Sequence, residues 1–231
     1  MGYVFAAPAQ AVVPIDSTSD LFPVHRIYCV GRNYAEHAKE MGFSEREAPV
    51  FFAKPPDAVL PVPFGTTGEL PYPGETTNLH HEIELVVAIG SGGSKIAAGH
   101  AAKHIYGYAV GLDMTRRDLQ FAMRDNGRPW DVAKGFDHSA PISPIKPVSM
   151  TGEIVSAQIW LNVNGERRQA SSTSKLIWSV NETIEHLSRF FELRPGDLIY
   201  TGTPEGVGAV KRGDELDGGI EHIGALKVKV V

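Results

Sequence analysis

The chain of 231 residues lacks several features that would place it in a specialised class of protein. Its single cysteine, Cys29, rules out an internal disulfide, and its apolar neighbours favour a buried core position. No apolar run approaches the roughly 20 residues that a membrane-spanning helix needs. A net charge of -5 offers no attraction to nucleic acid or anionic lipid, and no basic start followed by an apolar block marks a signal peptide. We therefore expect a cytoplasmic globular protein with no nucleic-acid or membrane partner.

Glycine and proline are abundant, with 24 and 16 residues, and they are scattered along the chain. That distribution favours short strands separated by turns over long helices. No internal repeat or low-complexity linker divides the sequence. We expect a β-rich α+β chain, in which residues 1–24 form an N-terminal arm and residues 25–231 form a single domain.

Local patterns predict the main elements. Alternating apolar residues predict strands, and apolar residues at helical spacing behind a capping pair predict helices. The dipeptide Asn164-Gly165 predicts a hairpin turn. The expected strands cover residues 26–30, 82–89, 105–112, 160–163, 197–201 and 224–230. The expected helices start at the capping pairs Asn33 with Glu36, Thr115 with Asp118, and Ser179 with Glu182. Residues 55–79 are rich in proline, and we expect an extended loop there.

The segment from His81 to Ile89 carries two acids inside an apolar strand pattern. Strand side chains repeat with period two, so Glu82 and Glu84 project from the same face. Neighbouring carboxylates that lose hydration repel each other, and a hard divalent cation such as Mg²⁺ relieves both penalties. An edge strand with its acidic face in water explains this segment equally well when the segment is taken alone.

A third acid, Asp113, ends the strand predicted over 105–112. Glu82, Glu84 and Asp113 can together supply three carboxylate ligands to one octahedral ion. Taken alone, Asp113 is better explained as a helix-start residue, because acids are favoured there. His80 and His81 suggest zinc, but they have neither a cysteine partner nor a His-x-x-x-His helix nearby, so we expect both to be structural.

Other polar groups suit acid–base chemistry or anion binding. His37 and Glu40 lie three positions apart on a predicted helix, where the carboxylate can orient the imidazole as a general base toward water. Basic and amide side chains further along can hold a carboxylate or a developing oxyanion: Arg117, Gln120, Lys134, Arg124 and Arg128. The Gly-rich turn after Tyr200 offers backbone amides and the Thr203 hydroxyl to an anion. Taken singly, the His37–Glu40 pair and the basic residues fit an ordinary polar surface better, and the Gly-rich turn lacks the Gly-Lys-Ser/Thr ending of a phosphate-binding loop.

Taken together in their order along the chain, the motifs point to a protein family more specifically than any single motif does. The order is Tyr28-Cys29-Val30-Gly31-Arg32-Asn33-Tyr34, His37-x-x-Glu40, His81-Glu82-x-Glu84, Leu112-Asp113-Met114-Thr115, Lys134 and Thr201-Gly202-Thr203-Pro204-x-Gly206-Val207-Gly208. It resembles the fumarylacetoacetate hydrolase family over about residues 25–231. Stretches at 114–120, 127–130 and 176–179 resemble most closely the family's small bacterial acylpyruvases, which hydrolyse fumarylpyruvate in gentisate breakdown.

The resemblance implies a mixed β-roll, a homodimer and a set of site residues. Glu82, Glu84 and Asp113 match metal-ligand positions that hold Mg²⁺ or Mn²⁺. His37 and Glu40 match a water-activating pair carried on a lid segment. The positions that match contacts with the pyruvoyl end of a substrate are Arg117, Gln120, Lys134 and Thr203. The implied reaction is metal-dependent hydrolysis of the carbon–carbon bond of an acylpyruvate, fumarylpyruvate to fumarate and pyruvate, with Lys134 assisting a developing enolate.

Three other functions remain open on the sequence. An oxaloacetate decarboxylase passes through the same pyruvate enolate but needs no attacking water. A hydroxy-dienedioate isomerase or decarboxylase needs a proton shuttle that the same three acids can serve. A metal-binding protein without catalysis has no use for His37 and Glu40 on one helix face, so their presence counts against it.

Overall fold

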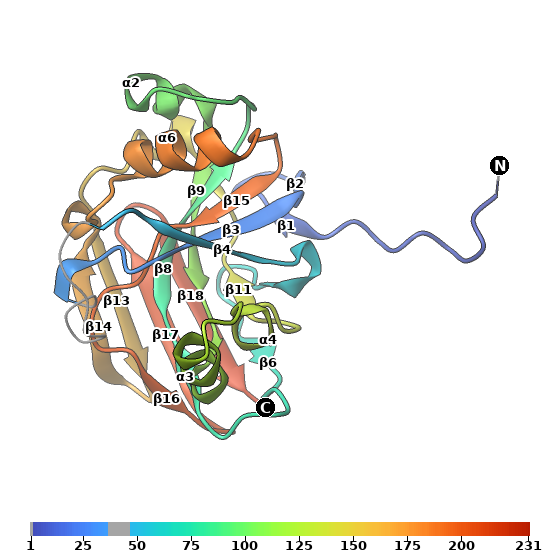
Figure 1. The fold of residues 1–231 in the computed structure, drawn as a ribbon, viewed down its shortest axis with the longest axis vertical. Helices are drawn as coiled ribbons and strands as arrows, with labels where there is room; N and C mark the ends of the chain where they lie inside the picture. The colour runs from blue at the N-terminus through green and yellow to red at the C-terminus, as the bar shows by residue number, and fades with distance from the viewer. Residues whose placement is uncertain (1, 37–46) are drawn as a thin grey trace.

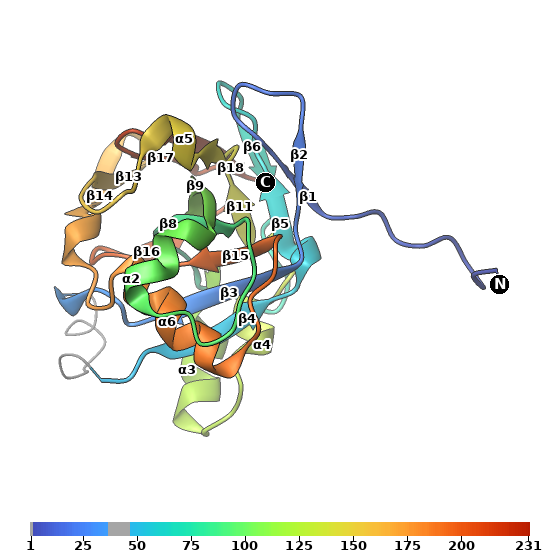
Figure 2. The same ribbon diagram turned by 90° about the horizontal axis from the view of Figure 1, so that it is seen from above.

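The computed structural model describes residues 2–36 and 47–231, in which strands predominate and helices are short (Figures 1 and 2). The strands are β1 Val12–Pro14, β2 Leu21–Pro23, β3 Arg26–Gly31, β4 Val50–Lys54, β5 Val59–Pro61, β6 Gly68–Leu70, β7 Leu79–His81, β8 Ile83–Ile89, β9 Ile105–Leu112, β10 Thr115–Arg116, β11 Ala140–Ile142, β12 Lys146–Pro147, β13 Gln158–Val163, β14 Glu166–Ser172, β15 Asp197–Tyr200, β16 Gly208–Val210, β17 Glu215–Ile220 and β18 Gly224–Val230. The α-helices are α2 Ala98–Ala101, α3 Arg117–Asp125, α4 Asp131–Lys134, α5 Val148–Thr151 and α6 Val180–Phe190. The 3-10 turns are η1 Pro56–Ala58, η2 Ala102–His104 and η3 Thr173–Lys175.

Strand β8 lies in the middle of the largest sheet, whose order is β4-β3-β15-β8-β9-β11-β5. All seven residues of β8 are buried, so the alternative of an edge strand with its acidic face in water is wrong. The predicted alternation is confirmed, because Ile83, Leu85, Val87 and Ile89 belong to one core cluster. Val86 and Ala88 belong to a second cluster on the opposite face. The apolar residues therefore fix which way the acidic side chains of this segment point.

The two core clusters lie on the two sides of this sheet. The larger one joins β8 to a second sheet, of order β14-β13-β17-β18-β6, and to helix α6. Leu161 of β13, Leu216 of β17 and Ile184 of α6 are fully buried in it. The strand-rich sheets with few short helices confirm the predicted β-rich α+β class (Figure 1).

Two local predictions are confirmed in detail. Asn164 and Gly165, with φ of 52° and 81°, form the tight turn between β13 and β14, a conformation that Asn-Gly adopts readily. Helix α6 begins with a capping box, in which the Ser179 hydroxyl accepts from the Glu182 N–H and the Glu182 carboxylate accepts from the Ser179 N–H. Cys29 is fully buried, as expected.

Other local predictions need correction. Residues 55–79 are not one extended loop, because β5 pairs in parallel with β11 and β6 with β18. Each of these strands has only three residues, too few to show an alternating pattern. Helix α3 exists, but Thr115 and Asp118 do not cap it. Asp118 instead accepts from the Thr76 hydroxyl at 2.6 Å, and the Thr115 hydroxyl accepts from Lys134 Nζ at 2.7 Å.

The N-terminal segment has two parts. Residues 2–7 run away from the body of the molecule (Figures 1 and 2), whereas the Ala11 carbonyl accepts from the Val24 N–H at 2.8 Å. The following residues form the β1–β2 hairpin, and Val13 and Phe22 are buried in the second core cluster. The division into an arm and a domain at residue 24 stays a prediction. Within the described part of the chain, no helix is long and apolar enough to cross a membrane.

Candidate metal centre and active site

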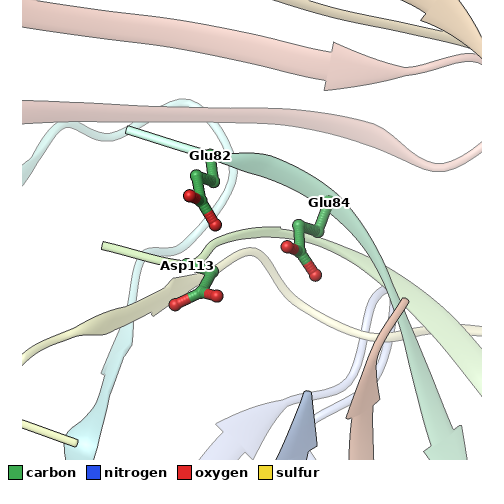
Figure 3. A group of neighbouring side chains, drawn as sticks. All are labelled: Glu82, Glu84 and Asp113. Atoms are coloured by element: carbon green, nitrogen blue, oxygen red, sulfur yellow. The ribbon is translucent and has the colours of Figure 1, made fainter. Parts of the chain in front are cut away.

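Three acids meet where β8 begins and β9 ends (Figure 3). The strands are antiparallel neighbours, with Ile83 opposite Leu112, so the residues Glu82 and Asp113 are brought side by side. The Asp113 N–H donates to the Glu82 carbonyl at 2.9 Å. Glu82, Glu84 and Asp113 are 5%, 2% and 1% exposed, and one oxygen from each lies within 4.8 Å of the others. We call these three residues the acidic triad.

Two cationic side chains from the following helices contact the acidic triad. Lys134, at the end of α4, donates from Nζ to Glu82 Oε2 at 2.8 Å and to Asp113 Oδ2 at 2.6 Å. Arg117, at the start of α3, donates from Nη2 to Glu82 Oε1 and from Nη1 to Gln120 Oε1. All are buried. Arg117, Gln120 and Lys134, which the sequence proposed from widely spaced positions, therefore lie together beside the acidic triad.

Lys54 is a site residue that the sequence prediction missed. Its side chain is fully buried, and its Nζ lies 2.8 Å from Asp113 Oδ1. The same ammonium donates to the backbone carbonyls of Met114 and Lys134. It therefore ties the Asp113 side chain to the segment that carries Lys134. The only signal in the sequence is a lysine that ends the apolar run of β4, which is not distinguishable from a surface residue at a strand end.

Crowding and burial set the ionisation of the acidic triad. Burial raises the pKa of Glu84 well above its ordinary value of 4.5, and the charges of Asp113 and Glu82 raise it further. A hydrogen bond at 2.8 Å from the Gly202 N–H to Glu84 Oε2 opposes this shift. Burial alone would lower the pKa of Lys134, but the charges of Asp113 and Glu82 raise it overall. Lys134 therefore stays charged, and the carboxylate of Glu84 is repelled by those of Asp113 and Glu82.

The donor set fits a hard divalent cation. It consists of carboxylate oxygens only, which suit Mg²⁺ and Mn²⁺ better than a soft ion. Although Lys54 lies close to Asp113 Oδ1, that oxygen is buried and accepts no hydrogen bond of good geometry from the described residues. A buried acceptor of this kind is a ready ligand, because unsatisfied buried oxygens are costly.

The two histidines stand apart from the acidic triad, as expected. His81 is buried, and its Nδ1 lies 3.0 Å from the Gln169 side-chain oxygen, while His80 Nε2 lies 3.0 Å from Asn78 Oδ1. Burial lowers the pKa of each to about 4, so both are neutral near pH 7. Neither histidine belongs to the cluster of possible metal ligands among the described residues.

The acidic triad lies in a cleft that is partly open to solvent. The lining also includes Arg117, Gln120, Lys134 and Thr203, together with Arg32, Phe52, Phe121, Arg124 and Trp130. The Thr203 hydroxyl donates to the Ile83 carbonyl at 2.8 Å and accepts from Gln169 Nε2 at 2.8 Å. These bonds fasten the Gly-rich turn to β8. A contact between Thr203 and a substrate stays a prediction.

The predicted water-activating pair, His37 and Glu40, lies outside the described residues. The chain approaches that segment through Asn33, which is 1% exposed. The Asn33 side chain donates to the carbonyls of Thr201 and Trp178 and accepts from the Trp178 N–H. Asn33 is thus fixed next to the turn whose Gly202 N–H donates to Glu84.

The family model for the fumarylacetoacetate (FAA) hydrolase C-terminal region matches residues 26–231, which is most of the chain. The protein therefore belongs to the fumarylacetoacetate hydrolase family of enzymes.

Relatives with high similarity carry two different names. The crystal structure of fumarylpyruvate hydrolase from Pseudomonas aeruginosa in complex with Mn²⁺ and pyruvate is 58% identical, with a TM-score of 0.98, and covers 100% of this chain and 99% of that one. Fumarylpyruvate hydrolase from Ralstonia sp is 48% identical over 80% of this chain and 93% of the relative. A mitochondrial oxaloacetate tautomerase from Rattus norvegicus is 42% identical over 88% of this chain and 90% of the relative.

Proposed function

We propose that the protein is a metal-dependent hydrolase of acylpyruvates, and that fumarylpyruvate is its substrate, giving fumarate and pyruvate. The observation that carries the proposal is the buried acidic triad with Lys134 and Arg117 against it in one cleft. The similarity to a fumarylpyruvate hydrolase in complex with Mn²⁺ and pyruvate supports both the metal and the substrate class.

Glu82, Glu84 and Asp113 would hold Mg²⁺ or Mn²⁺. A bound divalent ion supplies a Lewis acid that polarises a keto oxygen and stabilises negative charge developing there.

Charge balance explains why the pocket suits an anionic substrate. Two of the three carboxylates of the acidic triad, Glu82 and Asp113, are contacted by three cationic side chains, Lys54, Arg117 and Lys134. The protein groups therefore nearly cancel, and a divalent cation leaves the buried end of the cleft positive. A positive, water-poor site favours a carboxylate and an adjacent enolate oxygen over a neutral ligand.

The residues of the chain divide the remaining work. His37, oriented by Glu40, takes a proton from water, and the resulting hydroxide attacks the keto carbon distal to the pyruvoyl group. The carbon–carbon bond then breaks, its electron pair passes to the pyruvate fragment as an enolate, and a proton completes pyruvate. Lys134, which stays charged beside Asp113 and Glu82, stabilises the developing oxyanion through its positive charge. Arg117 and Gln120 hold the pyruvoyl carboxylate.

The test is product formation by the Mn²⁺-loaded enzyme. Purified protein is given fumarylpyruvate, and fumarate and pyruvate are quantified separately against a control treated with EDTA. We expect both products in equal amounts and none with EDTA. His37→Ala should lower the rate by about 10²–10⁴-fold, the usual effect of losing a general base. Unchanged hydrolysis by His37→Ala would refute its role in water activation.

Oxaloacetate tautomerisation is a second candidate, favoured by the 42% identity to a tautomerase over most of both chains. That reaction moves a proton within the substrate and consumes no water. Following the enol absorbance of oxaloacetate while measuring pyruvate separates the two functions. Tautomerase activity that survives His37→Ala, with no product from fumarylpyruvate, would favour this second candidate.

Three further parts of the proposal depend on the family resemblance. These are a homodimer, a cytoplasmic location and a place in gentisate breakdown. Light scattering of the purified protein tests the dimer directly.

A further inference from the structure

The two ends of the cleft differ in burial. At the inner end, the acidic triad, Arg117 and Lys134 are all at most 5% exposed. At the outer end, the side chains of Arg32 and Arg124 are 26% and 35% exposed. The apolar lining of the cleft includes the aromatic side chains Phe52, Phe121 and Trp130. We call Arg32 and Arg124 the outer arginine pair.

The two ends also differ in charge. Of the described residues, four with cationic side chains line the cleft, namely Arg32, Arg117, Arg124 and Lys134. Among the described residues, the only carboxylates in the lining are those of the acidic triad. The inner cations therefore face the carboxylates of the acidic triad, whereas Glu47 and Asp125, the carboxylates beside Arg32 and Arg124, lie outside the lining.

Backbone geometry presents Arg32 at this position. Arg32 follows β3 with a φ of 61°, in the left-handed region that a non-glycine residue seldom occupies. The neighbouring Asn33 is held by its bonds to Thr201 and Trp178, so the turn is imposed by tertiary contacts. Strained backbone that is fixed in this way is characteristic of functional sites. The Glu47 carboxylate, 57% exposed, lies 3.9 Å from the Arg32 guanidinium.

Arg124 lies on α3 and lines the same cleft as Arg32. Its guanidinium lies 4.8 Å from the centre of the Phe121 ring and 2.9 Å from Asp125 Oδ1. Asp125 is 61% exposed, and exposed ion pairs are weak, so a ligand can replace this partner at little cost. Burial lowers the pKa of Arg32, Glu47 raises it, and the charge of Arg124 lowers it again.

We propose that the outer arginine pair binds the distal carboxylate of a keto-diacid substrate, whose pyruvoyl end lies at the acidic triad. This inference rests on the proposed function for the placement of the pyruvoyl end. Two guanidinium groups match carboxylate oxygens through directed N–H donors. The centre of the Phe52 ring lies 5.1 Å from Lys134 Nζ and that of the Phe121 ring 4.8 Å from the Arg124 guanidinium, and these apolar surfaces suit the flat, conjugated middle of such a molecule. The outer arginine pair thus selects acylpyruvates that carry a second, distal carboxylate over acylpyruvates whose distal end is uncharged.

The test uses two non-hydrolysable keto acids of equal length. 2-Oxoheptanedioate has seven carbons and a distal carboxylate, and 2-oxoheptanoate has the same chain without it. Their dissociation constants for the Mn²⁺-loaded protein are measured by calorimetry. We expect the diacid to bind about 10–100-fold more tightly, the range for a charged hydrogen-bonded contact. Arg124→Gln and Arg32→Gln should each remove most of that preference while leaving the affinity for 2-oxoheptanoate nearly unchanged.

Arg128 supplies the matched control. It is exposed on the loop after α3 and lines a neighbouring groove rather than the cleft. Arg128→Gln should keep the full preference for the diacid. Equal binding of the two acids by the wild-type protein would overturn the proposal, and so would a preference that survives both Arg32→Gln and Arg124→Gln. If Arg32→Gln fails to fold, Arg124→Gln decides alone.

Turnover separates this inference from the proposed function. Hydrolysis of fumarylpyruvate and of acetylpyruvate, which has no distal carboxylate, is compared in each variant. Arg124→Gln should lower kcat/KM about 10–100-fold for fumarylpyruvate only. Selective binding of the diacid without hydrolysis of either substrate would refute the proposed function and support the carboxylate-binding role of the outer arginine pair. Equal losses on both substrates would refute the specificity role alone.

Discussion

Two buried acidic sites lie on the same sheet, and they are built in opposite ways. Asp197, at the start of β15, is a lone carboxylate that is fully buried. Its oxygens lie 2.8 Å from His25 Nδ1, 3.1 Å from Arg26 Nε, 2.9 Å from Arg26 Nη2 and 2.8 Å from the Arg194 backbone nitrogen. The acidic triad instead gathers three carboxylates within 4.8 Å of one another.

The difference shows what each site is for. Both carboxylate oxygens of Asp197 accept hydrogen bonds from protein donors. This carboxylate therefore links β3 to β15 without a bound cation. The acidic triad keeps mutual repulsion, seen in the raised pKa of Glu84, and an oxygen of Asp113 without a hydrogen bond. Burial of an acid is common to both sites. The site that is suited to a cation differs from the other in its crowding of like charges.

The largest effect is expected from removing a cation that balances the acidic triad. Lys54→Met leaves the buried Asp113 with less compensation, and breaking a buried pair typically lowers the free energy of unfolding by about 3–5 kcal/mol. Mn²⁺ should restore part of this loss, because a divalent cation supplies the missing positive charge. Urea unfolding in EDTA and in Mn²⁺ measures both. The exposed Lys175→Met is the control, and equal stability of the two variants would contradict the prediction.

Removing a member of the acidic triad should affect the metal and spare the fold. Glu84→Gln is expected to weaken Mn²⁺ binding by more than about 100-fold, beyond the effect of losing a residue that only supports a ligand. The free energy of unfolding in EDTA should stay equal or rise, because a buried charge is removed and the amide oxygen still accepts from the Gly202 N–H. Calorimetric Mn²⁺ titration and urea unfolding test the two halves. A loss of stability would show that Glu84 is structural.

The opposite pattern is expected at the lone acid. Asp197→Asn should lower the free energy of unfolding by about 1–3 kcal/mol, because donors from Arg26 and Arg194 lose a charged acceptor. Mn²⁺ affinity should not change, since Asp197 pairs near the far end of β8, roughly 16 Å from Glu84 at the rise of a strand. Urea unfolding and calorimetric Mn²⁺ titration of Asp197→Asn test these two expectations. Weakened metal binding would mean that the two sites are coupled.

The smallest effect is a pH dependence. A carboxyl whose pKa is raised by folding destabilises the folded state increasingly as pH rises above its ordinary value, 4.5 for Glu84. The gain in stability of Glu84→Gln over the wild-type protein in EDTA should therefore be small near pH 4.5 and larger near pH 7. Thermal unfolding of both proteins across this range measures the difference. If the difference in stability between the two proteins stays constant across this range, the raised pKa does not belong to Glu84.

Residues with strong local patterns were predictable, and those whose role depends on distant partners were not. The alternation in β8, the Asn164-Gly165 turn and the capping box of α6 each depend on neighbours within a few positions. Lys54 gave no usable signal, because its partner Asp113 lies far along the chain. The short strands β5 and β6 gave none either, since their pairing partners β11 and β18 come much later.

The sequence by itself determined the alternation that orients Glu82 and Glu84, the class of fold and the candidate ligands. Only the tertiary structure decided that Asp113, Lys134 and Lys54 meet these acids, because the register of β8 against β9 and the placement of α4 bring them together. It also decided that Arg32 and Arg124 line the cleft and that Arg128 does not. Local conformation follows from short-range sterics and periodicity, whereas the electrostatics of a site arise from contacts between residues that the sequence separates.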